Sequence, residues 1–349
     1  MNSARTEMSK PRLREASHPD SPWAMRTVNF EGWPGPVSAL GFGCASLGSR
    51  ISRKDGIAAV EQALAAGVTW FDVAPSYGDG DAEMILGTAL AKSKVAIATK
   101  VGLVSRPTSS AMGFARAIAR PLLSKPSTLR RFVRRLRKSA VQRTLLTGDT
   151  IRESLARSLE RLKVDSLALL ALHEPSLEEV RRTDVIRALN DAKRQGLVAR
   201  IGVAGSIESF LAAKTAGMAT DVLQTANSPF NPHSAQIREI ARQGDFTITH
   251  SVFGSDGRFD HLREAFDQDT AMRQTLENSG RAVRAADLPR FLLDYAFAAN
   301  PNGVVLLSSF SPQHLALNVA AASCEPAADL AAIVDRHFRA RAEDASHRH

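Results

Sequence analysis

Short runs of apolar residues alternate along this chain with longer segments in which apolar residues recur every three or four positions. The short runs span four to seven residues, are rich in Val, Ile, Leu and Ala, and several end on a polar residue. Such runs are typical of strands that are buried on both faces. Eight of them predict strands, at residues 40–44, 69–72, 95–99, 166–172, 198–203, 221–224, 246–250 and 303–307.

Helical spacing fills the intervals between these runs. Residues 150–162 show it clearly, because Leu155 and Leu159 fall on one side, and Thr150 with Glu153 fits a capping box at the start. Helices are predicted at residues 54–66, 84–90, 150–162, 177–195, 206–215, 233–243, 287–299, 312–322 and 326–341.

This alternation predicts the fold class, an α/β protein with the (β/α)8 TIM barrel fold. Eight strands, each followed by a helix, form that pattern, with parallel crossover connections. A doubly wound sheet is the alternative, but the glycines at 41, 43 and 48 do not open a helix, as a dinucleotide-binding glycine loop would. Two short candidate strands around Gly32–Pro36 predict an N-terminal β-hairpin, and residues 326–341 predict an extra C-terminal helix.

One domain accounts for most of the chain, since an α/β barrel of about 250 residues is a single domain. We assign residues 26–342 to that barrel, with an insertion at residues 103–147. The first 25 residues are polar, contain three prolines and lack the apolar segment of a secretory signal. Residues 1–25 and 343–349 are predicted to be disordered tails.

The cysteine count and the hydropathy indicate the cellular setting. Two cysteines, Cys44 and Cys324, lie far apart and lack metal-ligand spacing, which disfavours a disulfide framework or a metal site. No apolar run approaches the roughly 18 residues that a membrane span needs. We therefore expect a cytoplasmic protein that uses no metal and does not bind membranes.

The net charge of +9 has a local origin. Residues 103–147 carry eleven of the 45 Lys and Arg and none of the 36 Asp and Glu, so the rest of the chain is nearly balanced. This distribution does not favour nucleic-acid binding. A solvated amphipathic helix around residues 129–139 is one interpretation of the insertion. The other is a lid over the pocket that attracts an anionic substrate or an acidic carrier protein.

Polar residues stand where two predicted strands end. Asp72 ends one strand, Lys100 follows the next, and Tyr77 lies in the loop between them. The carboxyl ends of parallel strands meet at the ligand-binding edge, so these side chains should share one pocket. A nearby ammonium lowers the pKa of a phenol, which suits proton transfer. The alternative is an ordinary ion pair with a tyrosine on a loop.

The stretches FDVAPSYGDGDAEMILGTAL, ATK and LALLALHEP resemble the aldo-keto reductase superfamily in order and spacing. The resemblance implies a barrel that binds a nicotinamide cofactor and uses no metal. It also implies that Tyr77 donates a proton to a carbonyl, that Lys100 lowers the pKa of Tyr77, that Asp72 holds Lys100, and that His173 orients the carbonyl oxygen. From the residues alone, His173 fits the pocket or caps backbone groups at the strand end.

The positions that resemble the family's cofactor site match less closely. Ala204-Gly205 replaces the usual Ser-Asn, Gln224 matches, and His250-Ser251 replaces the frequent Tyr-Ser. The resemblance further implies a phosphate and adenine site in the segment after the last strand, where Phe310 replaces a frequent arginine. NADP(H) is expected over NAD(H) from the family. The cofactor-binding candidates are Ala204, Gly205, Gln224, His250, Ser251, Ser308, Ser309, Phe310, Gln313, His314 and Asn318.

These observations predict an oxidoreductase that moves a hydride between a nicotinamide and a carbonyl or alcohol carbon, with Tyr77 as general acid or base. The expected partner is a small carbonyl or alcohol substrate, which the lid interpretation of the insertion would make anionic or carrier-bound. One alternative is a module of the same fold that senses cofactor without turnover. Another is a lyase that forms a Schiff base on Lys100.

Overall fold

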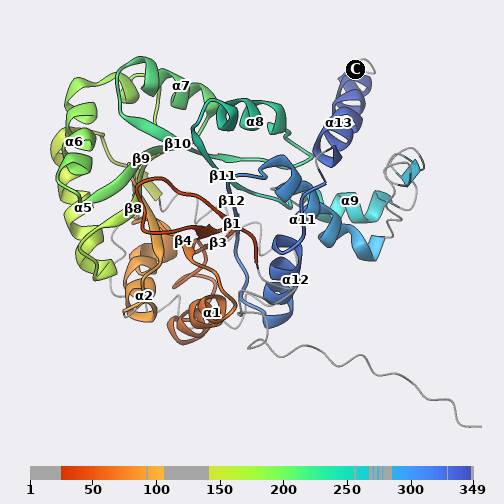
Figure 1. The fold of residues 1–349 in the computed structure, drawn as a ribbon, viewed down its shortest axis with the longest axis horizontal. Helices are drawn as coiled ribbons and strands as arrows, with labels where there is room; N and C mark the ends of the chain where they lie inside the picture. Colours follow the sequence, from red (N-terminus) through yellow and green to blue (C-terminus); the bar gives the residue numbers. More distant parts are fainter. Residues whose placement is uncertain are drawn as a thin grey trace, which may run out of the picture.

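The computed structural model shows a closed barrel of eight parallel strands (Figure 1). It describes residues 25–91, 93–105, 141–254, 257–266, 270, 273, 274, 277, 285–327 and 329–346. Neighbouring strands are consecutive along the chain, and the last pairs with the first. The barrel strands are β3 Leu40–Gly43, β4 Trp70–Asp72, β5 Ala96–Val101, β8 Leu167–His173, β9 Val198–Ala204, β10 Thr220–Ala226, β11 Phe246–His250 and β12 Val304–Leu307.

The apolar runs become barrel strands because both of their faces are covered. All seven residues of β8 are buried, as are all six of β5. The register pairs Asp72 with Ala98 and Lys100 with Ala171, so polar residues of three neighbouring strands reach one end of the barrel. The predicted eight-stranded barrel is confirmed.

Helices surround the barrel, and most occupy the predicted intervals (Figure 1). The main ones are α1 Arg53–Ala65, α2 Ala82–Ala89, α5 Gly148–Leu162, α6 Thr183–Arg194, α7 Ile207–Thr215, α8 Ser234–Arg242, α9 Arg258–Phe266, α11 Leu288–Ala299, α12 Pro312–Ala322 and α13 Leu330–Ser346. The helix predicted at 177–195 is instead a short 3-10 turn, η3 Glu179–Arg181, followed by α6. Glu179 closes that turn, since its carboxylate accepts from the Ser176 amide and its own amide donates to Ser176 Oγ.

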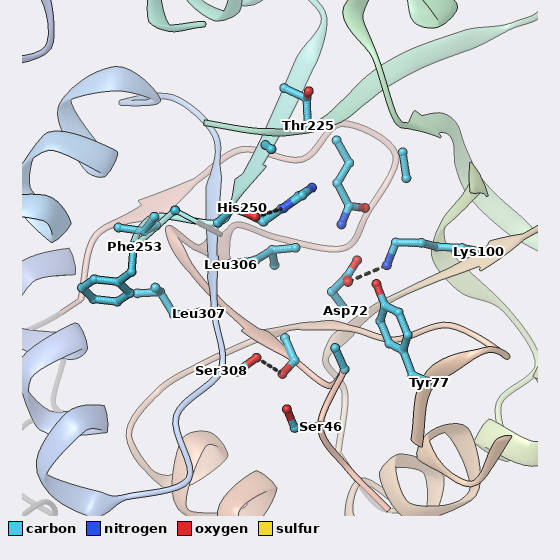
Figure 2. A pocket seen from close by; sticks show the side chains of 18 of the residues that line it. Ser46, Asp72, Tyr77, Lys100, Thr225, His250, Phe253, Leu306, Leu307 and Ser308 are labelled. Carbon is cyan, nitrogen blue, oxygen red and sulfur yellow. Dashed lines mark hydrogen bonds and ion pairs between the residues drawn. The ribbon is translucent and has the colours of Figure 1, made fainter. Parts of the chain in front are cut away.

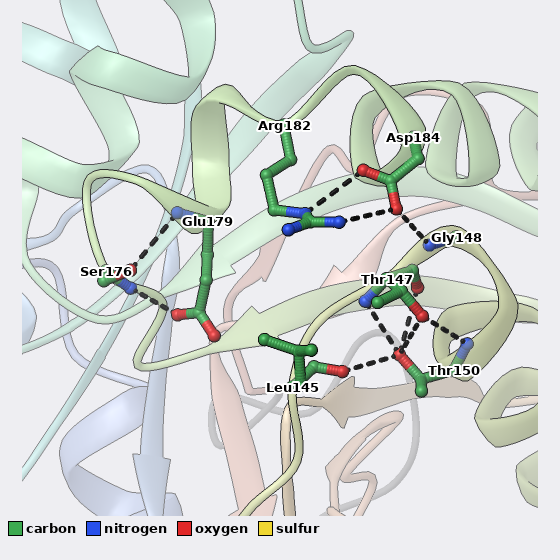
Figure 3. Close-up of polar contacts among 8 residues, drawn as sticks. All are labelled: Leu145, Thr147, Gly148, Thr150, Ser176, Glu179, Arg182 and Asp184. Atoms are coloured by element: carbon green, nitrogen blue, oxygen red, sulfur yellow. Dashed lines mark hydrogen bonds and ion pairs between the residues drawn. The ribbon is translucent and has the colours of Figure 1, made fainter.

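The start of α5 differs from the predicted capping box. Thr147 is the N-cap, and it exchanges hydrogen bonds with Thr150, so Glu153 takes no part (Figure 3). The Asp184 carboxylate accepts a further hydrogen bond from the Gly148 amide at 3.0 Å. A carboxylate at a helix N-terminus is favourable, and this one also binds Arg182.

The predicted N-terminal hairpin is present. Strand β1 Thr27–Val28 pairs antiparallel with β2 Val37–Ser38. Between them Phe30 is fully buried, with its ring 4.9 Å from Trp70 and 4.8 Å from Phe246, which lie at the starts of β4 and β11. The hairpin therefore covers the amino-terminal end of the barrel with aromatic side chains.

The ends of the basic insertion form a second antiparallel pair, β6 Leu103–Ser105 with β7 Val141–Arg143. Residues 106–140, which include the segment interpreted as a lid, lie outside the described residues, as does the tail at 1–24. At the other end α13 continues to Ser346, past its expected end at residue 341. Residues 343–346 are therefore helical, in contrast to the expected disordered tail.

Helix α13 is fastened to the barrel by a buried contact. Asp335 accepts a hydrogen bond of 2.6 Å from Tyr295 of α11, whose hydroxyl lies 3.0 Å from Ser234 of α8. In the described part of the chain, no helix is long and apolar enough to cross a membrane.

Candidate functional site

A cavity of about 1340 Å³ opens at the carboxyl ends of the barrel strands (Figure 2). Asp72, Tyr77, Lys100 and His173 all line it, and we refer to these four candidate catalytic residues as the catalytic set. They come from β4, the loop after it, β5 and β8. The structure thus brings together the four residues that the sequence singles out.

Lys100 and Asp72 form a buried ion pair in this cavity. The Lys100 Nζ atom donates to Asp72 Oδ1 at 2.5 Å and to the Val73 carbonyl at 3.2 Å. Lys100 is only 2% exposed and Asp72 only 3%. Burial lowers the pKa of Lys100, but Asp72 and Tyr77 outweigh burial and raise that pKa above its usual value. Lys100 is therefore held as a cation in a fixed position.

Tyr77 opens the 3-10 turn η1 Tyr77–Gly80, which packs against the loop after β3. Gly78 makes this possible, because it has φ +62° and a Cβ atom there would lie 1.9 Å from the Leu47 carbonyl oxygen. The turn places the Tyr77 ring 4.9 Å from Lys100 Nζ and, edge-on, 5.9 Å from the His173 ring. Cation, phenol and imidazole therefore meet at one point.

The pKa of Tyr77 is higher than usual, in contrast to the expected lowering. Burial is the largest cause of the rise, and Lys100 opposes it without cancelling it. Removing water disfavours the phenolate more than one neighbouring cation favours it, because that cation is already paired with Asp72. Tyr77 is thus a protonated donor at neutral pH.

His173 ends β8 and keeps a neutral ring. Burial, followed by the charge of Lys100, lowers the pKa of His173 to about 3. Its Nδ1 atom is buried and has no hydrogen-bond partner among the described residues. Through Nδ1, therefore, the ring caps no backbone group of the described residues. A buried nitrogen without a partner is costly, and a ligand oxygen would supply one.

Most of the candidate cofactor residues also line the cavity. They are Ala204, Gly205, Gln224, His250, Ser251, Ser308, Ser309, His314 and Asn318. Gln224 Oε1 is buried without a partner among the described residues, so it can accept a hydrogen bond from a carboxamide. This orphaned acceptor fits the amide group of a nicotinamide.

His250 and Ser251 contact each other at the end of β11. His250 Nδ1 lies 2.9 Å from Ser251 Oγ, and Ser251 adopts φ +62°. Burial and then Lys100 lower the pKa of His250 to about 4. The cavity thus contains a second neutral imidazole, with a flat face that can stack on a ring.

The segment Ser308–Asn318, which we call the β12 rim, differs from the expectation at two positions. Phe310 and Gln313 are not among the residues that line the cavity. The half-buried Phe310 ring packs against the core, 5.7 Å from Phe42 and edge-on to it, because an apolar ring gains more from this contact than from the polar cavity. Gln313 accepts a hydrogen bond from Ser311 at 2.7 Å.

Other lining residues carry no readable sequence pattern. Ser46, Arg50, Asn231, His233 and Phe253 lie in loops, whereas Thr225 belongs to β10 and Phe259 to α9. Arg50 precedes α1 and could be found from sequence only by knowing how the loop after β3 turns. Among the described residues, no group of three or more His, Cys, Asp or Glu side chains is arranged to hold a metal ion.

Comparison with known proteins agrees with this geometry. The model of the aldo/keto reductase family matches residues 39–338. The chain is 29% identical over 190 residues to D-threo-aldose 1-dehydrogenase from a Pseudomonas species, covering 50% of this chain and 52% of that protein. It is 28% identical over 180 residues to L-galactose dehydrogenase from Arabidopsis thaliana, covering 48% of this chain and 45% of that protein. The matches thus span about half the length of these relatives.

Solved structures share the fold at low identity. A glycerol dehydrogenase from Gluconobacter oxydans has a TM-score of 0.67 and 18% identity, covering 91% of this chain and 96% of that one. An aldo/keto reductase from Klebsiella pneumoniae, solved in complex with NADP and acetate, has a TM-score of 0.61 and 19% identity, covering 90% of this chain and 96% of that one.

Proposed function

Since this chain belongs to the aldo/keto reductase family, we propose that it transfers a hydride between a nicotinamide dinucleotide and the carbon of a carbonyl or alcohol group. The observation that carries the proposal is the catalytic set itself. A protonated phenol, a fixed ammonium and a neutral imidazole converge in one cavity, with the ammonium anchored on a buried carboxylate.

Each member of the set has a distinct task in carbonyl reduction. The cofactor, when bound, supplies the hydride. Tyr77 Oη donates a proton to the carbonyl oxygen, and the Lys100 cation stabilises the phenolate that remains. Asp72 keeps Lys100 charged and in place. A neutral His173 can hydrogen-bond the carbonyl oxygen and so orient it, without adding a charge.

The raised pKa of Tyr77 favours the reductive direction at neutral pH. A general acid must carry its proton when the reaction starts, whereas alcohol oxidation needs the phenolate. Oxidation should therefore accelerate as the pH rises, because a larger fraction of Tyr77 is then ionised.

For the dinucleotide, Gln224 would bind the carboxamide and His250 would stack on the nicotinamide ring. Preference for NADP(H) over NAD(H) is a prediction from the family, and the Klebsiella structure with NADP supports it for a relative of the same fold. Among the described residues of the β12 rim, no lysine or arginine is present to pair with a 2′-phosphate. Titration with both dinucleotides is therefore part of the test.

Small polyhydroxylated carbonyl compounds and their alcohols are the first substrates to try. The two relatives above carry the names D-threo-aldose 1-dehydrogenase and L-galactose dehydrogenase. The cavity also suits polar substrates, since Ser46, Thr225 and Asn231 line it. The geometry does not favour a Schiff base on Lys100, because a buried, paired ammonium is not a nucleophile.

The test compares the two tyrosines of the chain. Tyr77→Phe should lower kcat by about 10²- to 10⁴-fold, the usual contribution of a positioned general acid. Its dissociation constant for NADPH or NADH, measured by quenching of Trp fluorescence, should stay close to that of wild type.

Tyr295→Phe is the matched control. It removes the same hydroxyl outside the cavity, where Tyr295 binds Asp335, and it should lower Tm while sparing kcat. Survival of turnover in Tyr77→Phe would overturn the assigned proton donor. Binding of dinucleotide without turnover of any carbonyl or alcohol would favour a sensing module instead.

A further inference from the structure

One cation on the cavity wall takes no part in the catalytic set. Arg50 lies in the loop between β3 and α1 and lines the same cavity as Tyr77. Its side chain is exposed, and no hydrogen bond or ion pair joins its guanidinium to another described residue. A guanidinium with five donors beside a ligand cavity is well suited to an anion.

Among the described residues that line the cavity, Arg50 has no counterion. Among the described lining residues, the other cationic side chain is Lys100, which is neutralised by Asp72. The remaining carboxylate is Glu174, which follows β8, three strands further around the barrel from β3. No ion pair joins Arg50 to Glu174 in the described structure. The β3 side of the cavity is therefore positive and the β8 side negative.

The backbone that carries Arg50 is fixed relative to Tyr77. The amides of Ser49, Arg50 and Ile51 all donate to the Ser46 carbonyl, which ties the loop into a compact turn. The same loop packs on η1, since a Cβ atom on Gly48 would lie 3.1 Å from the Gly78 carbonyl oxygen. The loop after β3 and the Tyr77 turn thus behave as one packed unit.

Hydroxyl groups accompany the guanidinium on this wall. Ser46 and Ser49 also line the cavity, and Figure 2 shows Ser46 on the same side as Ser308, which donates to the Gly43 carbonyl at the end of β3. Because the Ser49 and Ser308 hydroxyls already donate to backbone carbonyls, the guanidinium of Arg50 is the main donor that this wall offers to a carboxylate or phosphate group. Neutral polar ligands would gain little from the positive charge.

We propose that Arg50 binds the carboxylate or phosphate group of an anionic substrate whose carbonyl lies at Tyr77. The proposal rests on the proposed function for the reacting end of that substrate. It assigns the positive charge to this loop and does not depend on the basic insertion. The pyrophosphate of the dinucleotide is also an anion that a guanidinium can bind. The experiment therefore has to distinguish binding of the substrate anion from binding of the pyrophosphate.

The test uses matched substrate pairs that differ by one anionic group, 4-carboxybenzaldehyde with benzaldehyde and glyceraldehyde 3-phosphate with glyceraldehyde. Wild type should prefer the anionic member of at least one pair. In Arg50→Ala the ratio of kcat/KM for the anionic member to that for the neutral member should fall by about 10- to 100-fold, the usual range for a charge-assisted hydrogen bond. Arg50→Lys should keep part of the ratio, because it retains the charge without the fork of donors.

Arg53→Ala is the matched control. Arg53 lies on α1 three residues away, contacts Thr88 and does not line the cavity, so the ratio should stay at its wild-type value. Added salt should lower the ratio in wild type and change it little in Arg50→Ala. A ratio within about twofold of wild type in Arg50→Ala would overturn the proposal.

Two further measurements separate this proposal from its premise. Calorimetric binding of 4-(hydroxymethyl)benzoate and of benzyl alcohol repeats the comparison without turnover, so it remains decisive if the protein reduces neither aldehyde. Binding of the benzoate that is equal in wild type and Arg50→Ala would refute the role of Arg50. A loss in Arg50→Ala confined to the dissociation constants of NADH and NADPH would place the anion on the dinucleotide, and would equally refute an anionic substrate.

Discussion

The catalytic set and the β12 rim both contribute to the cavity, but they differ in how many of their polar groups already have hydrogen-bond partners. In and beside the catalytic set, His173 Nδ1 and Gln224 Oε1 are buried without partners among the described residues. Along the part of the rim that lines the cavity, Ser308 donates to the Gly43 carbonyl and Asn318 donates to Ser309.

The difference indicates where a ligand contributes most. A buried polar atom without a partner raises the energy of the free protein, and a ligand that pairs with it recovers that cost. Groups that are already bonded to each other gain little from a ligand. Recognition at the catalytic set should therefore be strict, whereas recognition at the rim should tolerate substitution.

The largest effect is expected from Lys100→Met. It leaves the Asp72 carboxylate buried without its cation, which costs about 3–5 kcal/mol of the free energy of unfolding. Turnover should fall by about 10²- to 10⁴-fold, as the phenolate of Tyr77 loses its stabilising charge. Urea unfolding and steady-state kinetics measure the two effects.

Two variants sharpen this result. The double variant Asp72→Asn with Lys100→Met should regain stability but not turnover, because it removes the buried charge and not the chemical defect. Lys214→Met breaks the more exposed pair with Asp245 and should lose less stability and no turnover. Equal turnover in wild type and Lys100→Met would mean that the set is structural.

A moderate effect is expected on stability as the pH falls. The pKa of His173 is about 3 in the folded protein, against about 6.5 when unfolded, so the unfolded chain binds more protons between these values. The free energy of unfolding should therefore decrease as the pH drops from about 6.5 toward 3, by up to about 1.4 kcal/mol per pH unit for this one group.

His173→Gln isolates that contribution. The variant should show a shallower loss of stability in chemical denaturation at pH 6.5, 5.5 and 4.5. His250→Gln should also reduce the slope, over a range that ends nearer pH 4. An unchanged slope in His173→Gln would show that its ring is not a buried neutral group.

The smallest effect is expected at the β12 rim, from Phe310→Arg. The ring leaves its contact with Phe42, and the guanidinium turns to solvent at the edge of the cavity. Affinity for NADPH relative to NADH should rise by about tenfold, as expected for one charge-assisted hydrogen bond to a 2′-phosphate. Fluorescence titration gives both dissociation constants, and Phe310→Leu controls for the lost ring. An unchanged ratio would place residue 310 out of reach of the dinucleotide.

The sequence predicted the barrel well because its strands depend on local composition. A run such as Leu167–His173 is apolar throughout, and a strand covered on both faces needs no more than that. The catalytic set could also be predicted from the sequence. Asp72, Lys100 and His173 stand at or near strand ends, where the position in the chain determines the position in space. Helix starts were harder to predict. In α5 the cap is Thr147 in place of Thr150, and the first turn has a further partner 36 residues away, since Asp184 accepts from the Gly148 amide.

The net pKa of Tyr77 and the direction of Phe310 could not be predicted in the same way. Both depend on how much water the folded cavity excludes and on which neighbour a ring meets. Arg50 illustrates the same limit, because a loop residue faces a cavity only when the turn that carries it is known.

The hairpin at the amino-terminal end of the barrel has a kinetic consequence. With Phe30 packed between Trp70 and Phe246, that end is filled by aromatic side chains, and the cavity opens at the opposite end. The dinucleotide and the carbonyl compound of the proposed reaction would therefore enter by the same opening. If the dinucleotide lies deeper than the carbonyl compound, it has to enter first and leave last. Initial-rate patterns should then show an ordered mechanism. The product dinucleotide should inhibit competitively against the substrate dinucleotide, and a bound carbonyl compound should prevent the dinucleotide beneath it from dissociating.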